Sequence, residues 1–148
     1  FTGGLRETSA QTATIHDVAA DTFAKVLRFL YTGETAVAQV WEAEALLFAA
    51  DLLDVAPLRI RSAAWIHEHL EPRDCGRVWA VAEQMSVGYL RIRARDMVAD
   101  HIHTLRNDQS FLQELKPQHL AEVLSVDTLC INSEDEALTL ISSWINIE

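Results

Sequence analysis

Apolar side chains recur every three or four residues along most of this chain, a spacing that places them on one face of an α-helix. The pattern predicts helices at residues 21–31, 40–53, 57–70, 74–85, 89–102, 110–115, 117–124 and from residue 133 onward. The breaks between the later helices are short, so we expect antiparallel helical hairpins there. The chain is therefore predicted to be mainly α-helical.

Three helices have clear predicted buried faces. The first carries Phe23, Val26, Leu27, Leu30 and Tyr31; the second carries Trp41, Ala45, Leu46, Ala49, Ala50 and Leu53; the last carries Leu138, Ile141, Trp144 and Ile145. The four tryptophans are expected in the core or at an interface.

Local signals set the predicted ends of these helices. Gly33 is expected to end the first helix, because glycine readily adopts the left-handed conformation of a helix C-cap. Pro57 fits the first turn of the third helix, where its missing N–H costs little. Asp21 or Thr22, Asp74, and the capping box at residues 133–136 are the expected N-terminal caps.

Two short segments are predicted to be extended instead, which would add one or two short strands to the helices. Residues 12–18 are rich in β-branched side chains, and residues 35–38 follow the first helix. Pro72 disfavours helix at Glu71, and we place the junction between two units there. The predicted division is residues 1–70 and 71–148, and because the chain begins at Phe1, we expect it to be part of a longer polypeptide.

The formal net charge of −10 argues against binding to nucleic acid or to an anionic membrane surface. It serves solubility or provides an acidic face for a basic partner. The longest apolar run, residues 43–53, is interrupted by Glu44 and Asp51 and is not a membrane span. The two cysteines, Cys75 and Cys130, form no disulfide framework, so we expect an intracellular protein.

The histidines are the first candidates for site chemistry, since four of them form His-x-His pairs, His67 with His69 and His101 with His103. Both pairs fall in predicted helices, where positions i and i+2 point about 200° apart. They cannot chelate one ion without other ligands, so no metal site is predicted. The sequence has no nucleophile elbow and no phosphate-binding loop, so no cofactor and no enzymatic activity are predicted either.

Several short motifs resemble one known family. Residues 1–7 are similar to the F-x-G-G-φ-x-E segment at the end of the central helix of BTB/POZ domains. Residues 15–18 resemble the strand that follows, residues 29–33 the helix end Tyr-Thr-Gly, and residues 46–53 the L-L-x-A-A-D-x-L helix. The order and spacing of these motifs favour the C-terminal part of a BTB/POZ domain.

The second half is similar to the N-terminal part of a BACK domain. Residues 70–75 resemble its L-x-P-x-N-C junction, with Asp74 in place of the usual asparagine. Residues 111–115 and 133–145 follow the pattern of its later helices. The chain thus looks like the BTB–BACK region of Kelch-like proteins, which are substrate adaptors of cullin-3 ubiquitin ligases.

The resemblance implies a protein-interaction module. Leu5 and Glu7 match the φ-x-E signature that contacts cullin-3, and the start of BACK, the 3-box, extends that contact. The alternative is that Leu5 packs internally and Glu7 is solvated. The resemblance further implies a homodimer through the N-terminal half of BTB and substrate binding through a later domain, neither of which lies in residues 1–148. The second functional reading is a BTB–BACK scaffold for cytoskeletal or transcription-linked assembly, without ligase work.

The absent half of BTB has one consequence for this segment. The apolar face of the helix at residues 23–31 should be partly uncovered. We therefore expect the chain to self-associate when it is expressed by itself, or to require the missing segment.

Overall fold

The computed structural model describes residues 16–125 and 134–146, and this part of the chain is mainly helical, as predicted. Its helices are α2 (Ala20–Thr32), α3 (Val40–Leu52), α4 (Ala56–His69), α5 (Cys75–Gln84), α6 (Gly88–Leu105), α7 (Gln109–Glu114), α8 (Pro117–Leu124) and α9 (Glu134–Ile145), with a 3₁₀ turn, η1 (Pro72–Asp74). The predicted helices match these bounds closely. No strand occurs within the described ranges.

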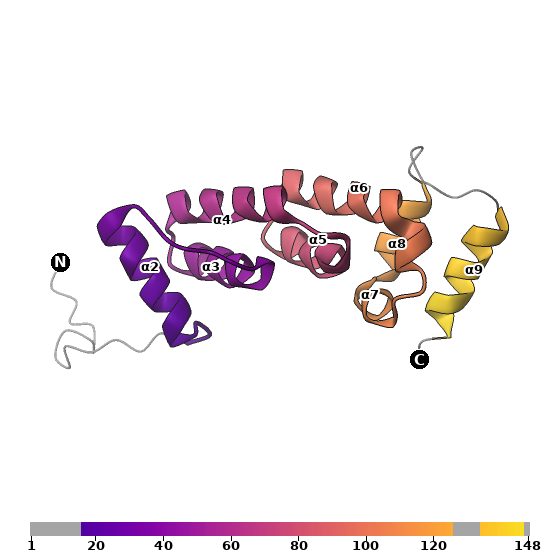
Figure 1. Cartoon of the computed structure of the whole chain (residues 1–148), viewed down its shortest axis with the longest axis horizontal. Helices are drawn as coiled ribbons and strands as arrows, with labels where there is room; N and C mark the ends of the chain where they lie inside the picture. The colour runs from indigo at the N-terminus through magenta and orange to yellow at the C-terminus, as the bar shows by residue number, and fades with distance from the viewer. Residues whose placement is uncertain (1–15, 126–133, 147–148) are drawn as a thin grey trace, which may run out of the picture.

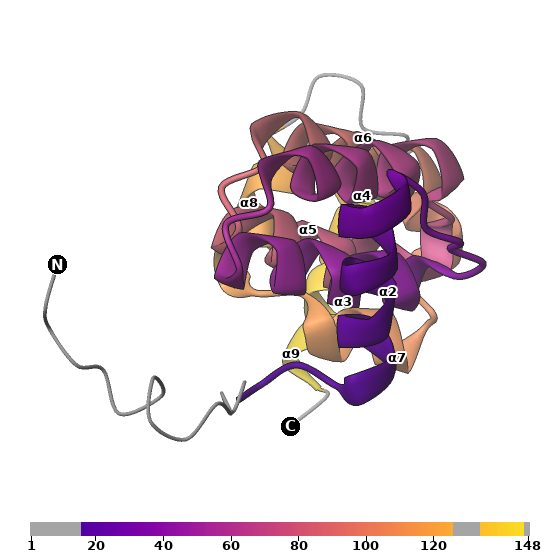
Figure 2. The same cartoon turned by 90° about the vertical axis from the view of Figure 1, so that its left-hand side faces the viewer.

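The helices form two rows (Figure 1). Helices α4 and α6 follow one another along one row, and α3 and α5 lie beneath them in the other, an arrangement also visible end-on in Figure 2. Each lower helix packs against an upper one, α3 against α4 and α5 against α6, which gives the expected hairpins. Helix α2 closes one end of the molecule and α9 the other.

Glycine and proline mark the helix ends as predicted. Gly33 has a φ of 72° and donates its backbone N–H to the carbonyl of Phe29 at 2.7 Å, which ends α2. Pro57 lies in the first turn of α4, and Pro72 begins η1.

The predicted side-chain caps are wrong where they can be checked. The cap residue of α2 is Ala19, and neither Asp21 nor Thr22 stands at that position. Asp74 precedes α5 but makes no capping bond, because its carboxylate binds Arg77 instead. Asp108 caps α7 by accepting from the backbone N–H groups of Ser110 and Phe111, and the proposed box at residues 133–136 begins outside the described residues.

The expected extended segments form no sheet in the part of the chain that the structure describes. Residues 35–38 are an irregular connection between α2 and α3, so the strand predicted there is wrong. A strand needs a partner to bond its backbone groups, and here the backbone N–H of Ala38 is bonded to the carboxylate of Glu42 instead. Residues 16–18 are also irregular, and residues 12–15 lie outside the described ranges.

A large hydrophobic core runs along the molecule from α3 to α9 and crosses residues 70 and 71 without interruption. Trp79 on α5 is its largest fully buried side chain. The indole stacks on the imidazole of His119, with ring centroids 4.4 Å apart. His119 is itself fully buried and donates a hydrogen bond from Nε2 to Glu83, which joins α8 to α5.

A smaller core lies where α2, α3 and α4 meet. Its buried members are Val26, Leu46, Ala49, Ala50 and Leu58. Leu46 belongs to this small core, and its neighbour Leu47 belongs to the large one, so α3 has apolar contacts on two sides.

All three predicted apolar faces need correction, and on α3 the misassigned position is Trp41, which is exposed. On α2 only Val26 is fully buried, while Leu30 is 58% exposed and Tyr31 87% exposed. On α9 the buried position is Leu140 rather than Leu138, because the helix turns its face of Ile141 and Trp144 toward the core. The indole N–H of Trp144 donates to the carbonyl of Leu115, and Ile145 is exposed.

Candidate protein-binding grooves at the junction

A groove of about 710 Å³ lies where the two predicted units meet. Its walls come from the start of α3, the end of α4, and the η1–α5 segment. The end of α4 and the η1–α5 segment are consecutive in the sequence, and the packing of α3 against α4 brings the more distant start of α3 to them. The following residues line it: Ala38, Gln39, Val40, Trp41, Glu68, His69, Leu70, Glu71, Arg73, Asp74 and Arg77.

Trp41 is the largest apolar side chain on this groove. It is 58% exposed, although the sequence pattern assigns it to the buried face of its helix. It also lines a second groove, of about 490 Å³, between α2 and α3. A tryptophan exposed between two grooves has the character of an interface anchor.

The segment before Trp41 is held by Glu42. This carboxylate accepts from the backbone N–H of Ala38 and lies 3.1 Å from the ammonium group of Lys25 on α2. The bond from Ala38, followed by the one from Lys25, lowers the pKa of Glu42 below its ordinary value. The start of α3 is thereby tied both to the preceding loop and to α2.

His69 forms part of the wall contributed by α4. Its ring stacks on Trp65, with centroids 4.0 Å apart, and its Nδ1 lies 2.9 Å from the Trp65 carbonyl. His67 instead contacts Tyr89 of α6, so the two members of this pair face different neighbours, as their helical spacing predicts. In the part of the chain that the structure describes, no three metal-ligating side chains lie close enough together to hold an ion.

Charged side chains crowd the η1–α5 side of the groove. Arg77 binds Glu44 of α3 and Asp74, while Arg73 binds Glu71 at 2.9 Å. Burial raises the pKa of Glu44, and the neighbouring Arg77 opposes that effect. The wall is therefore polar and mixed in charge, which suits recognition of a polar or charged segment of another protein.

A further groove, of about 820 Å³, continues past η1 toward the turn between α6 and α7. Glu71 and Arg73 line both this groove and the junction groove, so the two adjoin along η1. Pro72 and Leu105 contribute its apolar surface. The junction groove and this further groove together form one surface that extends from Trp41 to Ser110.

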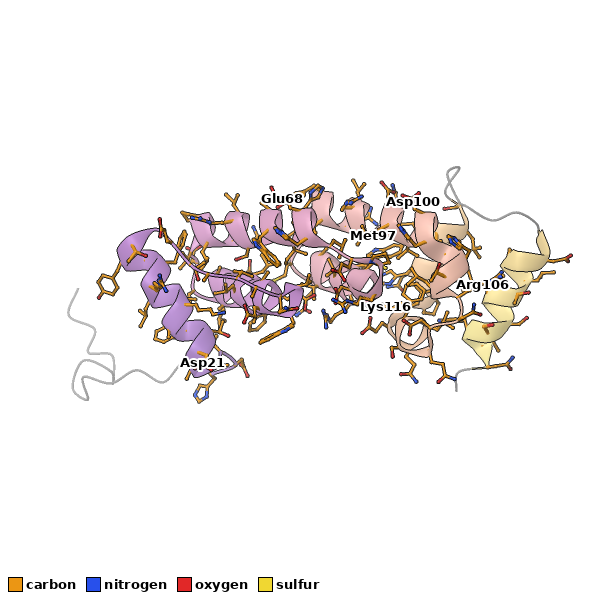
Figure 3. The ribbon with its side chains drawn as sticks, in the orientation of Figure 1. Asp21, Glu68, Met97, Asp100, Arg106 and Lys116 are labelled. Carbon is orange, nitrogen blue, oxygen red and sulfur yellow. The ribbon has the colours of Figure 1, made fainter. Side chains whose placement is uncertain are left out.

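The outer edge of the α4–α6 row carries exposed carboxylates, including Glu68, which also lines the junction groove. Glu68 and Asp100 lie along the outer edge of the α4–α6 row (Figure 3). Within the described ranges, no helix is both long enough and apolar enough to cross a membrane.

The structure does not place the predicted cullin-contact pair, because Leu5 and Glu7 lie outside the described residues. Sequence reasoning also missed the junction groove itself. Its one available signal was Trp41, at the start of a helix and directly beside Glu42. That signal is weak, because α3 is apolar on two sides and periodicity does not separate the exposed position from the buried ones.

The comparisons with known proteins divide the chain between two families. A BTB/POZ domain matches residues 1–69, and BACK, described as BTB And C-terminal Kelch, matches residues 75–148. Kelch-like protein 21 of Homo sapiens and of Rattus norvegicus are each 32% identical to the whole chain, and Kelch-like protein 3 of Homo sapiens is 28% identical.

The chain spans about a quarter of the length of these relatives, 24% of Kelch-like protein 21 and 25% of Kelch-like protein 3. The two family matches follow one another in the order that the motifs predict. The chain therefore belongs to the BACK family and carries a BTB/POZ segment ahead of it, as in the Kelch-like proteins.

Proposed function

We propose that this chain is the BTB–BACK part of a substrate adaptor for a cullin-3 ubiquitin ligase, and that it binds proteins rather than catalysing a reaction. The observation that carries the proposal is the succession of BTB/POZ and BACK matches along a chain that aligns throughout with Kelch-like proteins. The function of such a module depends on the surfaces with which it binds other proteins.

The cullin-binding surface in this proposal has two parts. Leu5 is the apolar anchor, and Glu7 sets the register beside it. The second part is the surface formed by the adjoining grooves along η1, where Trp41 offers an exposed aromatic side chain. Large buried anchors dominate the affinity of most interfaces, while rim charges mainly tune the association rate.

The remaining partners follow from the same proposal. The adaptor forms a homodimer through the N-terminal part of BTB and holds its substrate through a later domain. It works inside the cell, in the cytoplasm or the nucleus, and requires no cofactor. The division into a BTB unit of residues 1–70 and a BACK unit of residues 71–148 belongs to the proposal as well.

Titration calorimetry of the full-length protein against the N-terminal domain of cullin-3 tests the proposal. Leu5→Ala should weaken binding by roughly thirty-fold, because truncating a central anchor costs about 2 kcal/mol. Trp41→Ala should also weaken binding, and Glu7→Ala should weaken it less. Leu138→Ala is the matched control, since Leu138 is an exposed leucine on α9 at the far end of the molecule.

Two outcomes would contradict parts of the proposal. Equal binding by wild type and Leu5→Ala would remove Leu5 from the contact. Absence of any binding by the wild type would favour the alternative, a BTB–BACK scaffold for cytoskeletal or transcription-linked assembly.

A further inference from the structure

Arg77 joins the BTB unit to the BACK unit on the lower row of helices. From α5 its guanidinium reaches Glu44 of α3, with Nε 3.0 and 3.1 Å from the two carboxylate oxygens. Its Nη2 lies 2.9 Å from Asp74 at the start of α5. A single guanidinium group thus binds one carboxylate from each side of residues 70 and 71.

A third carboxylate supports this arrangement from α7. The Glu114 carboxylate lies beside the start of α5: burial raises its pKa, and the charge of Arg77, followed by the Arg77 backbone N–H, opposes that effect. It packs so closely there that a Cβ added to Gly76 would lie 3.1 Å from Glu114 Oε2 and 3.2 Å from the ring of Phe111. Gly76 therefore allows α7 to approach α5 and places the Glu114 carboxylate beside the first turn of α5.

The two rows of helices cross the junction in different ways. In the upper row α4 packs directly against α6, whereas the backbones of α3 and α5 in the lower row hardly approach each other. Leu70 and Glu71, which connect α4 to η1, have extended backbone conformations. An extended connection of this kind can absorb a rotation between units.

The two members of the Arg77–Glu44 ion pair differ in their exposure to water. The Glu44 side chain is 12% exposed and that of Arg77 40% exposed. A partly buried pair of this kind is screened less by solvent than a surface pair. Removing Arg77 alone would leave the Glu44 carboxylate sheltered and without its cation, which favours separation of α3 from α5.

We propose that Arg77 is a positioning residue that fixes the angle between the BTB and BACK units, by holding Glu44 of α3 and Asp74 of α5 together on the lower row. The α4–α6 contact and the shared core join the two units, and the Arg77 contacts on the lower row select one angle about the extended residues 70 and 71. In the adaptor proposed above, this angle determines whether the two parts of the cullin-binding surface can contact one cullin molecule at the same time. That consequence rests on the proposed function. The role of Arg77 in setting the angle does not depend on the proposed function.

The test measures the angle without any partner. Spin labels on Arg28→Cys of α2 and Gln113→Cys of α7, both exposed positions on opposite sides of the junction, report the distance across the lower row. Cys130→Ser removes one native thiol. Cys75 can remain, because it is buried and its thiol pKa is raised to about 12, chiefly by that burial. Labelled chain is mixed with excess unlabelled chain, so that only distances within one molecule are recorded.

Arg77→Met should shift the distance distribution to longer values by at least the width of the wild-type distribution. Arg91→Met is the matched control: Arg91 pairs with Glu122 at 2.8 Å, at a similar exposure of 34%, but entirely within the BACK unit. It should leave the distribution unchanged even where it lowers thermal stability by a similar amount.

The double variant Glu44→Leu with Arg77→Met keeps the test decisive if the single variant folds poorly, because it leaves no sheltered carboxylate without a partner. It should fold and still show the longer distances. A wild-type distribution in this double variant would overturn the proposal, whatever its stability. Cullin-3 binding is measured separately, so a failure of the proposed function would leave the distance result intact.

Discussion

The two cores of this molecule differ in how completely they are enclosed. The large core is surrounded by helices from α3 to α9 and contains the fully buried ring of Trp79. The small core lies under a single helix, α2, whose outer side leaves Leu30 and Tyr31 in solvent. Both cores use α3, so a difference in their stability arises from what covers them rather than from the helix they share.

Leu46 and Leu47 give the sharpest test of this contrast, because both are fully buried neighbours on α3 but belong to different cores. Leu47→Ala should lower the free energy of unfolding by about 2–5 kcal/mol, the range for a leucine truncated in a core that cannot collapse. Leu46→Ala should fall at the lower end, because α2 is packed on one side only and can shift into the space. Urea unfolding followed by circular dichroism measures both, and a larger loss for Leu46→Ala would reverse the comparison.

The second largest effect is expected on self-association, through the exposed side of α2. The chain expressed by itself should self-associate through Leu30 and Tyr31, because burying a leucine side chain is worth about 1.5–3 kcal/mol. Leu30→Glu should then weaken association by roughly tenfold or more in sedimentation equilibrium. Ile60→Glu is the control, since Ile60 is also an exposed apolar residue but lies on α4. A wild-type chain that stays monomeric at all concentrations would contradict the prediction.

The smallest expected effect concerns acid stability of the large core. The hydrogen bond from His119 is the main cause that lowers the pKa of Glu83 below its ordinary value of 4.5. Because the folded-state pKa is the lower one, the stabilisation is present above pH 4.5 and is lost as the pH falls through the lowered value. Glu83→Gln should make the acid-side loss of stability shallower, by no more than about 1 kcal/mol, since Glu83 is partly exposed.

Denaturant midpoints measured from neutral to acid pH would check this. Glutamine still accepts a bond from His119, so the fold should persist in the variant. Glu68→Gln, which changes an exposed glutamate on α4, should follow the wild-type curve. An unchanged slope in Glu83→Gln would assign the acid sensitivity to other groups.

Helix positions could be predicted from the sequence because their signals are local. Gly33, Pro57 and Pro117 each act on one or two neighbouring residues, and each lies where the structure begins or ends a helix. The helical class and the hairpins follow from the same local patterns. The proposed division of the chain and the roles of Leu5 and Glu7 remain predictions.

Side-chain exposure could not be predicted to the same degree, because it depends on which other helix is present. On α9 a buried face that includes Leu140 fits the helical period as well as one that includes Leu138, and only docking against the large core selects the first. Trp41 and Leu30 fall on apolar faces by periodicity, yet none of the residues that the structure describes covers them fully. The junction groove exists only after α3, α4 and η1 have met, so no single stretch of sequence encodes it.

The close approach of α7 to Gly76 also has a consequence for the order of events during biosynthesis. The first turn of α5 packs against residues of α7, which leave the ribosome later. Most of the stability of a short helix in a protein comes from its tertiary packing. We therefore expect α5 to be incompletely stabilised in the nascent chain until α7 emerges and docks on Gly76, so that translation beyond Glu114 completes the BTB–BACK junction.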